Sequence, residues 1–435
     1  MTLNNRKPWL LMSVLILLVY GVYLAAQWPL AGKNLYGYIS FNYKRINLLE
    51  TSIPQKHISN DFGYDGQFYY RLALEPFSNK KYVQGIGFDH PPWRQQRILL
   101  PLLTWSIARG KPELSAAVML AINLLSVVGI SLIGGMLLRQ RGLSPWPALL
   151  LAFYPGFAIS VERFLTEPLS CMLLLLSLLS LVHKRVAWAG VALALAVLAR
   201  ETALAAALAV AGIWFLQSVL RIKFDQWKAP GPAYWLPAII TYISWQLWLQ
   251  DNWSSSALSA AEKGNLLGWP LAGLAVSFRQ LVTQISLDNV FFLSMMLAVV
   301  GWAIMLAIIF RRSEGPYRWM WLAFLALATL LGPPIWNNSP GFLRTMTELN
   351  VLGMLIYLLA VQKPHRLVMT AWLGCWLLTA GAEGYRLHLI ERAKSATQTS
   401  SQSTLHSAAS GITKPGAAAI FKNPKILPRT SLFAH

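Results

Sequence analysis

Charged side chains are scarce in this sequence. Only 12% of the 435 residues are Asp, Glu, Lys or Arg, whereas 55% are hydrophobic and 19 are Trp. An ordinary soluble domain carries about a quarter charged residues. The shortage therefore excludes a typical soluble enzyme and indicates a protein that crosses the membrane several times.

Cysteine is nearly absent as well. The two cysteines, Cys171 and Cys375, both lie inside apolar runs, where a cysteine behaves as a small hydrophobic residue. Neither a disulfide framework nor a cysteine-based metal cluster can be built from them.

Acidic residues are also few. The 17 Asp and Glu stand against 37 Lys and Arg, giving a net charge of +20. Most of the bases fall in short clusters between apolar runs, which is the pattern of membrane topology and not of a nucleic-acid surface. We therefore expect membrane lipid, and no nucleic acid, among the partners.

The chain begins with a short basic segment that contains Arg6 and Lys7, followed by a long apolar run. A cleaved signal peptide is one interpretation of residues 1–28. Because this run is about as long as a bilayer span and more spans follow, we expect an uncleaved first helix with its N-terminus in the cytoplasm.

Apolar runs recur along the chain, most of them long enough to cross roughly 30 Å of hydrocarbon at about 1.5 Å per residue. They predict an all-α polytopic membrane protein with about eleven transmembrane helices, and soft boundaries leave the number between ten and twelve. The runs lie at 9–26, 113–137, 145–161, 166–182, 186–199, 202–220, 233–249, 290–310, 319–336, 347–361 and 367–383.

A further apolar run, 98–108, would extend only about 16 Å as a helix, too short to span. If it does not cross, the basic clusters between the spans all share the cytoplasmic face; if it crosses, the later clusters fall outside. We therefore expect an interfacial or re-entrant helix on the outer face. The clusters are Arg6-Lys7, Arg139/Arg141, Lys184-Arg185, Arg221/Lys223/Lys228, Arg311-Arg312/Arg318 and Lys363/Arg366.

Two external loops follow from this topology, at about 29–112 and about 250–289. In the first, Tyr64, Phe68, Leu72 and Phe77 recur near helical spacing, which predicts a helix along the membrane surface. The sequence WPLAGLAVSFRQLVTQI predicts another surface helix in the second loop.

The end of the chain differs in composition. The transmembrane domain is expected to cover 1–392, and the Ser- and Thr-rich segment 393–435 to form a disordered tail. Three bases, Arg386, Arg392 and Lys394, do not fit the topology, because they follow the last span on the outer side, where the positive-inside rule disfavours them.

The unusual charges converge on the outer ends of the predicted spans. A charge in hydrocarbon costs roughly 2.5–3.5 kcal/mol even on a mild insertion scale, so such residues persist when they are paired or used. They are Asp61 and Asp65, then Glu162, Arg163 and Glu167, then Arg200 and Glu201, and finally Arg344 and Glu348.

Asp61 and Asp65 are spaced i, i+4 and share one face if the segment is helical. A loop acid can simply cap the surface helix. For Asp65 we favour a functional role, because bases lie opposite and aromatic neighbours offer a sugar platform. For Asp61 both interpretations, a helix cap and a functional role, remain open. Phe68, Tyr69 and Tyr70 fit a sugar platform and an interfacial aromatic belt equally well.

The arginines allow two interpretations. Arg344 and Glu348 are spaced i, i+4 and can pair on one helix. The neighbours Glu162-Arg163 and Arg200-Glu201 point different ways, so each member needs its own partner. Alternatively, guanidinium groups match phosphate oxygens with two parallel bonds, as a phosphate-linked lipid requires.

The segment FDHPPWRQQRILLP brings Asp89, His90, Arg94 and Arg97 together just before the short run. Its bases can hold lipid headgroups or belong to the site. His90 and His57 are lone histidines without ligand spacing, so a metal there is disfavoured.

Several motifs resemble those of bacterial membrane proteins of cell-surface glycopolymer formation. They are YDGQFYYRLALEPF, RQQRILLPLL, YPGF, LTEPL and LARETAL. More distantly, Tyr64-Asp65-Gly66 and Tyr69 resemble the Trp-Asp-Gly-x-x-Tyr signature of the GPI mannosyltransferase 2 family. Both resemblances cover most of residues 9–360 and imply a GT-C class glycosyltransferase of the bacterial cytoplasmic membrane, with its active site on the extracytoplasmic face.

The resemblance implies Asp65 as catalytic base, with Asp61 supported only by proximity, and a polyprenyl-phosphate-linked sugar donor with a glycan or lipid acceptor. No cofactor is required, although Asp61 and Asp65 together are able to hold a divalent cation. Tyr64 in place of Trp, and Gln67 after the Gly, leave the sugar open. The expected phosphate-binding residues are Arg344, Arg163, Arg97 and Arg200. The expected substrate-positioning residues are Tyr64, Gln67, Tyr69, His90, Glu167, Glu201 and Glu348.

Two other functions remain open at this point. A flippase or transporter for a lipid-linked sugar would place polar groups near the bilayer midplane, whereas here they cluster at the outer ends. A glycan polymerase or ligase would share the outer face and the arginines.

Overall fold

The computed structural model describes most of the chain. The described residues are 7–59, 63–222, 227–259, 264–283, 315–336, 339–361 and 364–410, with a few more between 296 and 307. The predicted span 290–310 therefore lies largely outside the described residues, as does Asp61.

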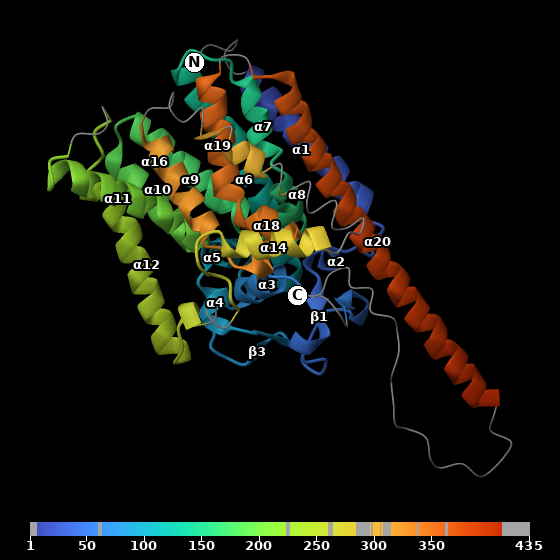
Figure 1. The fold of residues 1–435 in the computed structure, drawn as a ribbon. Helices are drawn as coiled ribbons and strands as arrows, with labels where there is room; N and C mark the ends of the chain where they lie inside the picture. Colours follow the sequence, from blue (N-terminus) through green and yellow to red (C-terminus); the bar gives the residue numbers. More distant parts are fainter. Residues whose placement is uncertain are drawn as a thin grey trace.

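The molecule is a bundle of helices (Figure 1). In the described part, three helical segments are long and apolar enough to cross a membrane: α1 (Lys7–Gln27), α6 (Pro112–Gln140) and the segment Glu201–Ser218. They mark the chain as a membrane protein.

Other apolar runs form helices near the predicted positions. They are α9 (Glu167–Val182), α10 (Val186–Ala199), α11 (Leu204–Ser218), α12 (Pro232–Trp253), α16 (Pro316–Thr329) and α19 (Thr347–Ala360). Three of them, α9, α12 and α16, have Pro in the first turn, where its missing N–H costs nothing.

The predicted span 145–161 is not a single helix. It divides into η4 (Trp146–Ala148), α7 (Leu149–Ala152) and α8 (Pro155–Glu162). Tyr154 is extended, with ψ 131°, because the ring of the following proline disfavours a helical conformation at this position.

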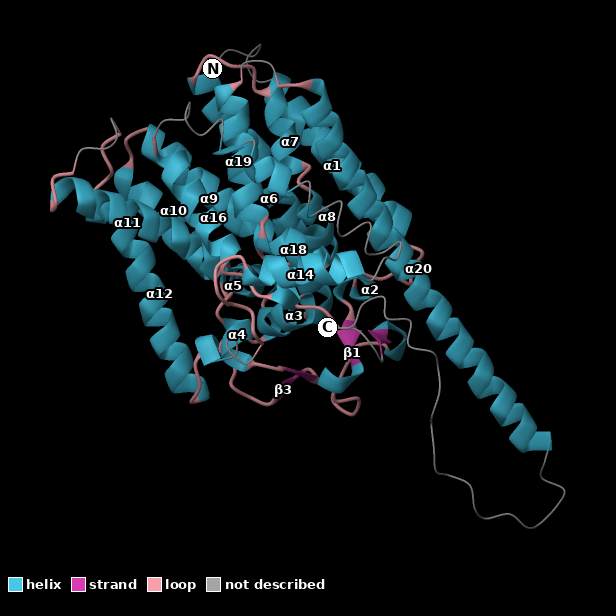
Figure 2. Cartoon of the chain, viewed as in Figure 1, coloured by secondary structure: helices cyan, strands magenta, loops and turns pink. Residues whose placement is uncertain are grey.

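The first loop folds into a layer of short elements at the end of the bundle far from the N-terminus (Figure 2). In chain order it contains α2 (Tyr36–Ile39), β1 (Phe41–Asn42), η2 (Tyr43–Arg45), η3 (Gln55–His57), β2 (Ile58–Ser59), α3 (Gly66–Leu74), β3 (Tyr82–Val83), β4 (Ile86–Gly87), α4 (Pro91–Gln95) and α5 (Leu99–Ala108). Strand β1 pairs in parallel with β2, and β3 pairs antiparallel with β4. Within the described residues the class is all-α apart from these two-residue strands.

Helix α3 corrects one prediction. It forms where the spacing of Phe68 and Leu72 indicates a helix, but every residue from Gly66 to Leu74 is buried. It is an internal helix of the layer and not a surface helix, because the other short elements of the first loop cover its outer face. The short run 98–108 forms α5, of ten residues.

The second half adds α14 (Ala272–Thr283), α17 (Pro333–Trp336), α18 (Ser339–Thr345) and the 45-residue α20 (Arg366–Ser410). Helix α14 lies in the predicted surface-helix segment. Helix α20 continues to Ser410, beyond the expected start of the disordered tail at Ala393, because a helix already nucleated adds one backbone bond per further residue. Residues 411–435 lie outside the described part.

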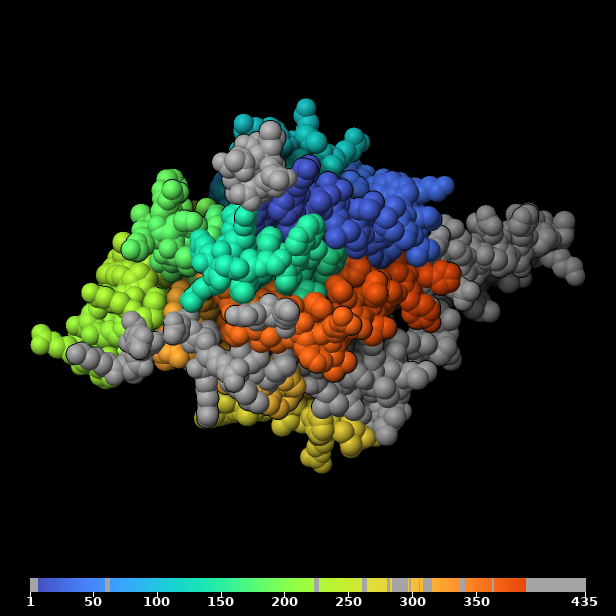
Figure 3. All heavy atoms as spheres, turned by 90° about the horizontal axis from the view of Figure 1, so that it is seen from above, coloured from blue at the N-terminus to red at the C-terminus, as the bar shows by residue number. Residues whose placement is uncertain are grey.

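Basic clusters gather at the N-terminal end of the bundle. The Arg139 guanidinium lies 5.5 Å from the Trp9 ring centre, and Gln140 approaches a His183 ring nitrogen at 3.2 Å. Arg141 lies near Tyr317 at the start of α16. Seen from this end, α10 to α12 form a lobe beside the main body (Figure 3). The first-loop layer lies at the opposite end (Figure 1).

Candidate functional site

Three arginines surround the carboxylate of Asp65. Arg94 Nη1 donates to Asp65 Oδ1 at 2.6 Å, and Arg344 Nη2 donates to Oδ2 at 2.9 Å. Arg97 Nη1 lies 3.9 Å from Oδ2. Residues from two neighbouring elements of the first loop thus meet a residue of α18 that is 279 positions distant in sequence.

The Asp65 side chain does not act as a helix cap. Asp65 occupies the N-cap position of α3, but its carboxylate makes no capping hydrogen bond. Its oxygens turn to the arginines instead, so the capping interpretation is wrong for this residue.

Gly66 fixes the start of α3 against α8. A Cβ at Gly66 would lie 2.1 Å from the Arg163 carbonyl oxygen, far inside van der Waals contact. Only glycine permits this approach of two backbones. The Tyr-Asp-Gly motif therefore has a packing reason for its glycine, and this packing sets the position of Asp65.

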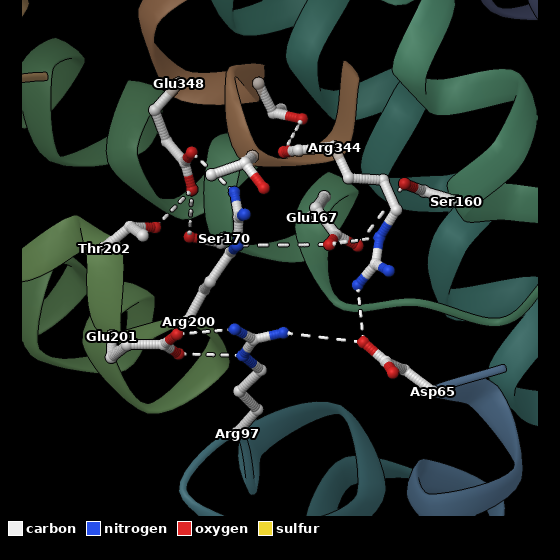
Figure 4. Close-up of polar contacts among 12 residues, drawn as sticks. Asp65, Arg97, Ser160, Glu167, Ser170, Arg200, Glu201, Thr202, Arg344 and Glu348 are labelled. Atoms are coloured by element: carbon white, nitrogen blue, oxygen red, sulfur yellow. Dashed lines mark hydrogen bonds and ion pairs between the residues drawn. The ribbon is translucent and has the colours of Figure 1, made fainter. Parts of the chain in front are cut away.

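Further carboxylates accept hydrogen bonds from the arginines of the site (Figure 4). Arg344 Nε donates to Glu167 at 2.9 Å, and Arg97 Nε donates to Glu201 at 2.8 Å. Arg200 donates to Glu348 at 2.7 Å and lies 4.0 Å from Glu167. The predicted i, i+4 pair of Arg344 with Glu348 is wrong, because both residues find partners on other helices.

Exposure decreases from Asp65 into the bundle. One fifth of the Asp65 side chain is accessible, and Glu201 is similar at 18%. Arg200 and Glu348 are almost completely buried, at 3% and 1%. A ligand from the water would reach Asp65 and Arg94 first and then Arg344 and Arg97, whose side chains are 10% and 9% exposed, whereas Arg200 is buried behind them.

The pKa of Asp65 lies below its ordinary value. Burial acts to raise this pKa, but the charges of Arg94, Arg344 and Arg97 lower it by more, with help from the Arg344 hydrogen bond. Asp65 is therefore ionised at neutral pH.

A second charged cluster lies beside the first. Arg163 Nε donates to Glu383 at 3.0 Å, and Arg386 joins Glu383 at 2.9 Å and Glu162 at 3.2 Å. Tyr23 also donates to Glu162. This cluster ties α20 to α8 and α1. Arg163 is thus buried against a carboxylate, and the structure does not present it to the water as a phosphate ligand.

Tyr64 connects the two clusters. The Arg163 guanidinium lies 4.0 Å from the Tyr64 ring centre and that of Arg344 lies 4.9 Å away. The ring is half-buried and offers cation–π contacts to both.

Other predicted positions have different surroundings. Tyr69 is buried and receives a bond from Arg97 at 3.0 Å. Gln67 is buried too, and its amide oxygen accepts from the Asn42 backbone N–H. His90 is exposed at the start of α4.

The expected sugar platform is wrong, because Phe68, Tyr69 and Tyr70 are all 3% exposed or less. Phe68 lies under Arg94, with 4.5 Å from the guanidinium carbon to the ring centre, and Tyr70 packs against Tyr36. Tyr64 and Trp93 are the half-buried rings beside the arginines.

Four residues of the two clusters were missed as site residues. Glu383 and Arg386 both come from α20. Asp89 binds Arg94 through both carboxylate oxygens at 2.8 and 2.7 Å, and Arg94 contacts Asp65 directly. The signal for Arg386 was its position against the positive-inside rule. In the structure its charge is paired with Glu383 and Glu162.

No group of three or more His, Cys, Asp or Glu residues that could hold a metal ion occurs among the residues that the structure describes. Comparisons with protein-family models, with curated proteins and with solved structures found no match to this chain. The function is therefore argued from the site itself.

Proposed function

We propose that this protein is a GT-C-like membrane glycosyltransferase of the bacterial cytoplasmic membrane. It transfers a sugar, with inversion, from a polyprenyl-phosphate-linked donor to a glycan or lipid acceptor at the extracytoplasmic face, in cell-surface glycopolymer synthesis. About eleven spans carry the site, and three of them are already evident from length and composition.

The observation that carries the proposal is the contact of one accessible carboxylate with guanidinium groups from distant elements. Asp65 lies 2.6 Å from Arg94 and 2.9 Å from Arg344. A glycosyl transfer needs a proton acceptor and, beside it, positive charge for a phosphate leaving group. This pair of requirements matches Asp65 and its arginines.

The reaction balances with these groups. The acceptor hydroxyl oxygen bonds to the anomeric carbon, and its proton goes to an Asp65 oxygen. The bond from the anomeric carbon to the phosphate oxygen breaks, and the polyprenyl phosphate leaves with the electron pair. Arg344, Arg94 and Arg97 stabilise the charge that develops on this phosphate.

The arginines also control how strong a base Asp65 is. While Arg94 and Arg344 bind Asp65, its pKa is too low for an efficient base. A donor phosphate competes for the same guanidinium groups. When Arg344 turns to the phosphate, Asp65 loses part of its stabilisation and its pKa rises, so the base strengthens when the donor is bound.

The distribution of bases supports the orientation. Arg139, Arg141 and His183 gather at the N-terminal end, and Asp65 lies in the first-loop layer at the other end. By the positive-inside rule the N-terminal end is cytoplasmic, which leaves Asp65 on the extracytoplasmic side.

Replacing Asp65 tests the proposal. Asp65→Asn keeps the shape of the side chain but removes the base, so glycopolymer transfer by purified protein in vesicles should fall by about 10²- to 10⁴-fold. Glu75→Gln is the matched control, because Glu75 is an exposed acid at the end of α3, and it should keep full activity.

Full transfer by a folded Asp65→Asn protein would rule out the assigned base. Movement of a labelled lipid-linked sugar across vesicles without transfer to any acceptor would favour a flippase instead.

A further inference from the structure

A hollow lies beside the first-loop layer, where α1 ends and α2 begins. Its volume is about 310 Å³, and it is lined by Leu24, Ala25, Trp28, Leu35, Tyr38 and Leu120. None of the six lining side chains is charged, and none belongs to the two charged clusters. The hollow is therefore a separate, apolar site.

The helices on both sides of the hollow carry exposed apolar residues. Both α1 and α6 are long and apolar enough to span a membrane. On α1 an exposed apolar stripe runs through Leu11, Val14, Leu18 and Val22 at helical spacing and leads to Ala25 in the hollow. On α6, which supplies Leu120 to the hollow, Leu125 is also 64% exposed. What enters the hollow along these faces is hydrocarbon from the bilayer.

The turn after α1, which continues from the lining residue Trp28, and the neighbouring Lys56 form what we call the rim of the hollow, and this rim contains two lysines. The turn after α1 contains Gly32 and Lys33, both with positive φ, and the Lys33 backbone N–H donates to the Trp28 carbonyl at 3.0 Å. Lys56 Nζ approaches the Gly32 carbonyl at 3.4 Å, and both lysine side chains are exposed.

Two aromatic residues, Trp28 and Tyr38, line the hollow close to this rim. The Trp28 and Tyr38 ring centres are 6.3 Å apart, and the Tyr38 hydroxyl donates to the Leu24 carbonyl at 2.7 Å. Trp and Tyr gather at the headgroup level of membranes. The rim therefore combines the charge and the rings that suit a lipid headgroup.

We propose that the hollow binds one anionic phospholipid from the leaflet on the Asp65 side. One acyl chain lies in the hollow between α1 and α6, and the phosphate lies at Lys33 and Lys56. Charge complementarity selects an anionic lipid over a zwitterionic one. This site is distinct from the arginines assigned to the donor.

Native mass spectrometry of the delipidated, detergent-purified chain tests this proposal. Phosphatidylglycerol and phosphatidylcholine of equal chain length are added separately. We expect a higher affinity for phosphatidylglycerol, and Lys33→Gln and Lys56→Gln should each lower it about fivefold while leaving phosphatidylcholine unchanged. Lys81→Gln, an exposed lysine elsewhere in the first loop, should have no effect.

A second variant fills the hollow. Ala25→Trp should lower the binding of phosphatidylglycerol at least tenfold, whereas Val22→Trp, one turn earlier on the exposed stripe, should not. Unchanged binding by Ala25→Trp, or equal affinity for the two phospholipids, would overturn the proposal.

The last measurement uses polyprenyl phosphate as a competitor for phosphatidylglycerol. If it displaces phosphatidylglycerol at equal concentration, the hollow belongs to a polyprenyl lipid and the phospholipid assignment fails. Because no sugar transfer is measured, this experiment gives its answer whether or not the proposed glycosyltransferase activity holds.

Discussion

At Asp65, burial and the neighbouring arginines act on the pKa in opposite directions, and the arginines prevail. The residue is thus a structural anion in the absence of a ligand. Under the proposed mechanism, Asp65 becomes a better base as a phosphate draws the guanidinium groups away, so we expect the chemical step to follow donor binding.

The same shift predicts how stability depends on pH. The folded-state pKa of Asp65 lies below its unfolded value of about 3.9, so ionised Asp65 stabilises the fold above about pH 4 and loses this effect as pH falls through the folded pKa. The difference in unfolding midpoint between wild type and Asp65→Asn should be constant from about pH 5 to 8 and shrink below about pH 4. Tryptophan fluorescence on heating in detergent measures both midpoints. A difference that disappears between about pH 5 and 7 would contradict the cause assigned to the shift.

At the scale of elements, the position of α3 depends on one glycine. Gly66→Ala would place a methyl group 2.1 Å from the Arg163 carbonyl, so α3 must move and carry Asp65 with it. We expect a loss of transfer of about 10²-fold, because displacements of about 1 Å at a catalytic group have this effect.

Gly21→Ala on α1 is the control, because a Cβ there meets nothing within 4 Å. It should keep wild-type transfer. Wild-type transfer by Gly66→Ala as well would show that this contact does not position the base.

Helix α20 is held to the bundle by the second cluster. Glu383 is 4% exposed and accepts bonds from Arg163 and Arg386, so Glu383→Gln leaves the buried Arg163 without its counter-charge and the half-buried Arg386 with Glu162 alone. We expect a loss of about 3 kcal/mol, seen as a lower unfolding midpoint.

A double-mutant cycle with Arg163→Met and Glu383→Met separates the pair from its surroundings. The double variant should be less destabilised than the sum of the two single variants. Additive effects would show that the pair is not coupled. Glu113→Gln, an exposed acid at the start of α6, should leave the midpoint unchanged.

The sequence allows prediction of local features and fails on long-range partners. Apolar length predicts most helices, and charges at span ends identify Asp65, Arg344 and Glu167. The pairing of Arg163 with Glu383, 220 positions apart, depends on which helices become neighbours, and no local pattern encodes that choice. The burial of α3 has the same origin, because it depends on the later elements of the loop that fold over it.

For the whole molecule, the account predicts that two exposed lysines lie on opposite sides of the membrane. After replacement of Cys171 and Cys375 by Ala, Lys81→Cys should react with an impermeant maleimide in intact cells. Lys184→Cys should react only after permeabilisation, because it lies at the end with the basic clusters. Labelling of both from outside would refute the orientation.

The most direct measurement is a cryo-electron microscopy map of the full chain with a bound polyprenyl-phosphate-linked sugar. The account predicts phosphate density within hydrogen-bond distance of Arg344 and Arg94 or Arg97, with the anomeric carbon facing Asp65. Phosphate density at the opposite end, beside Arg139 and Lys184, would contradict it.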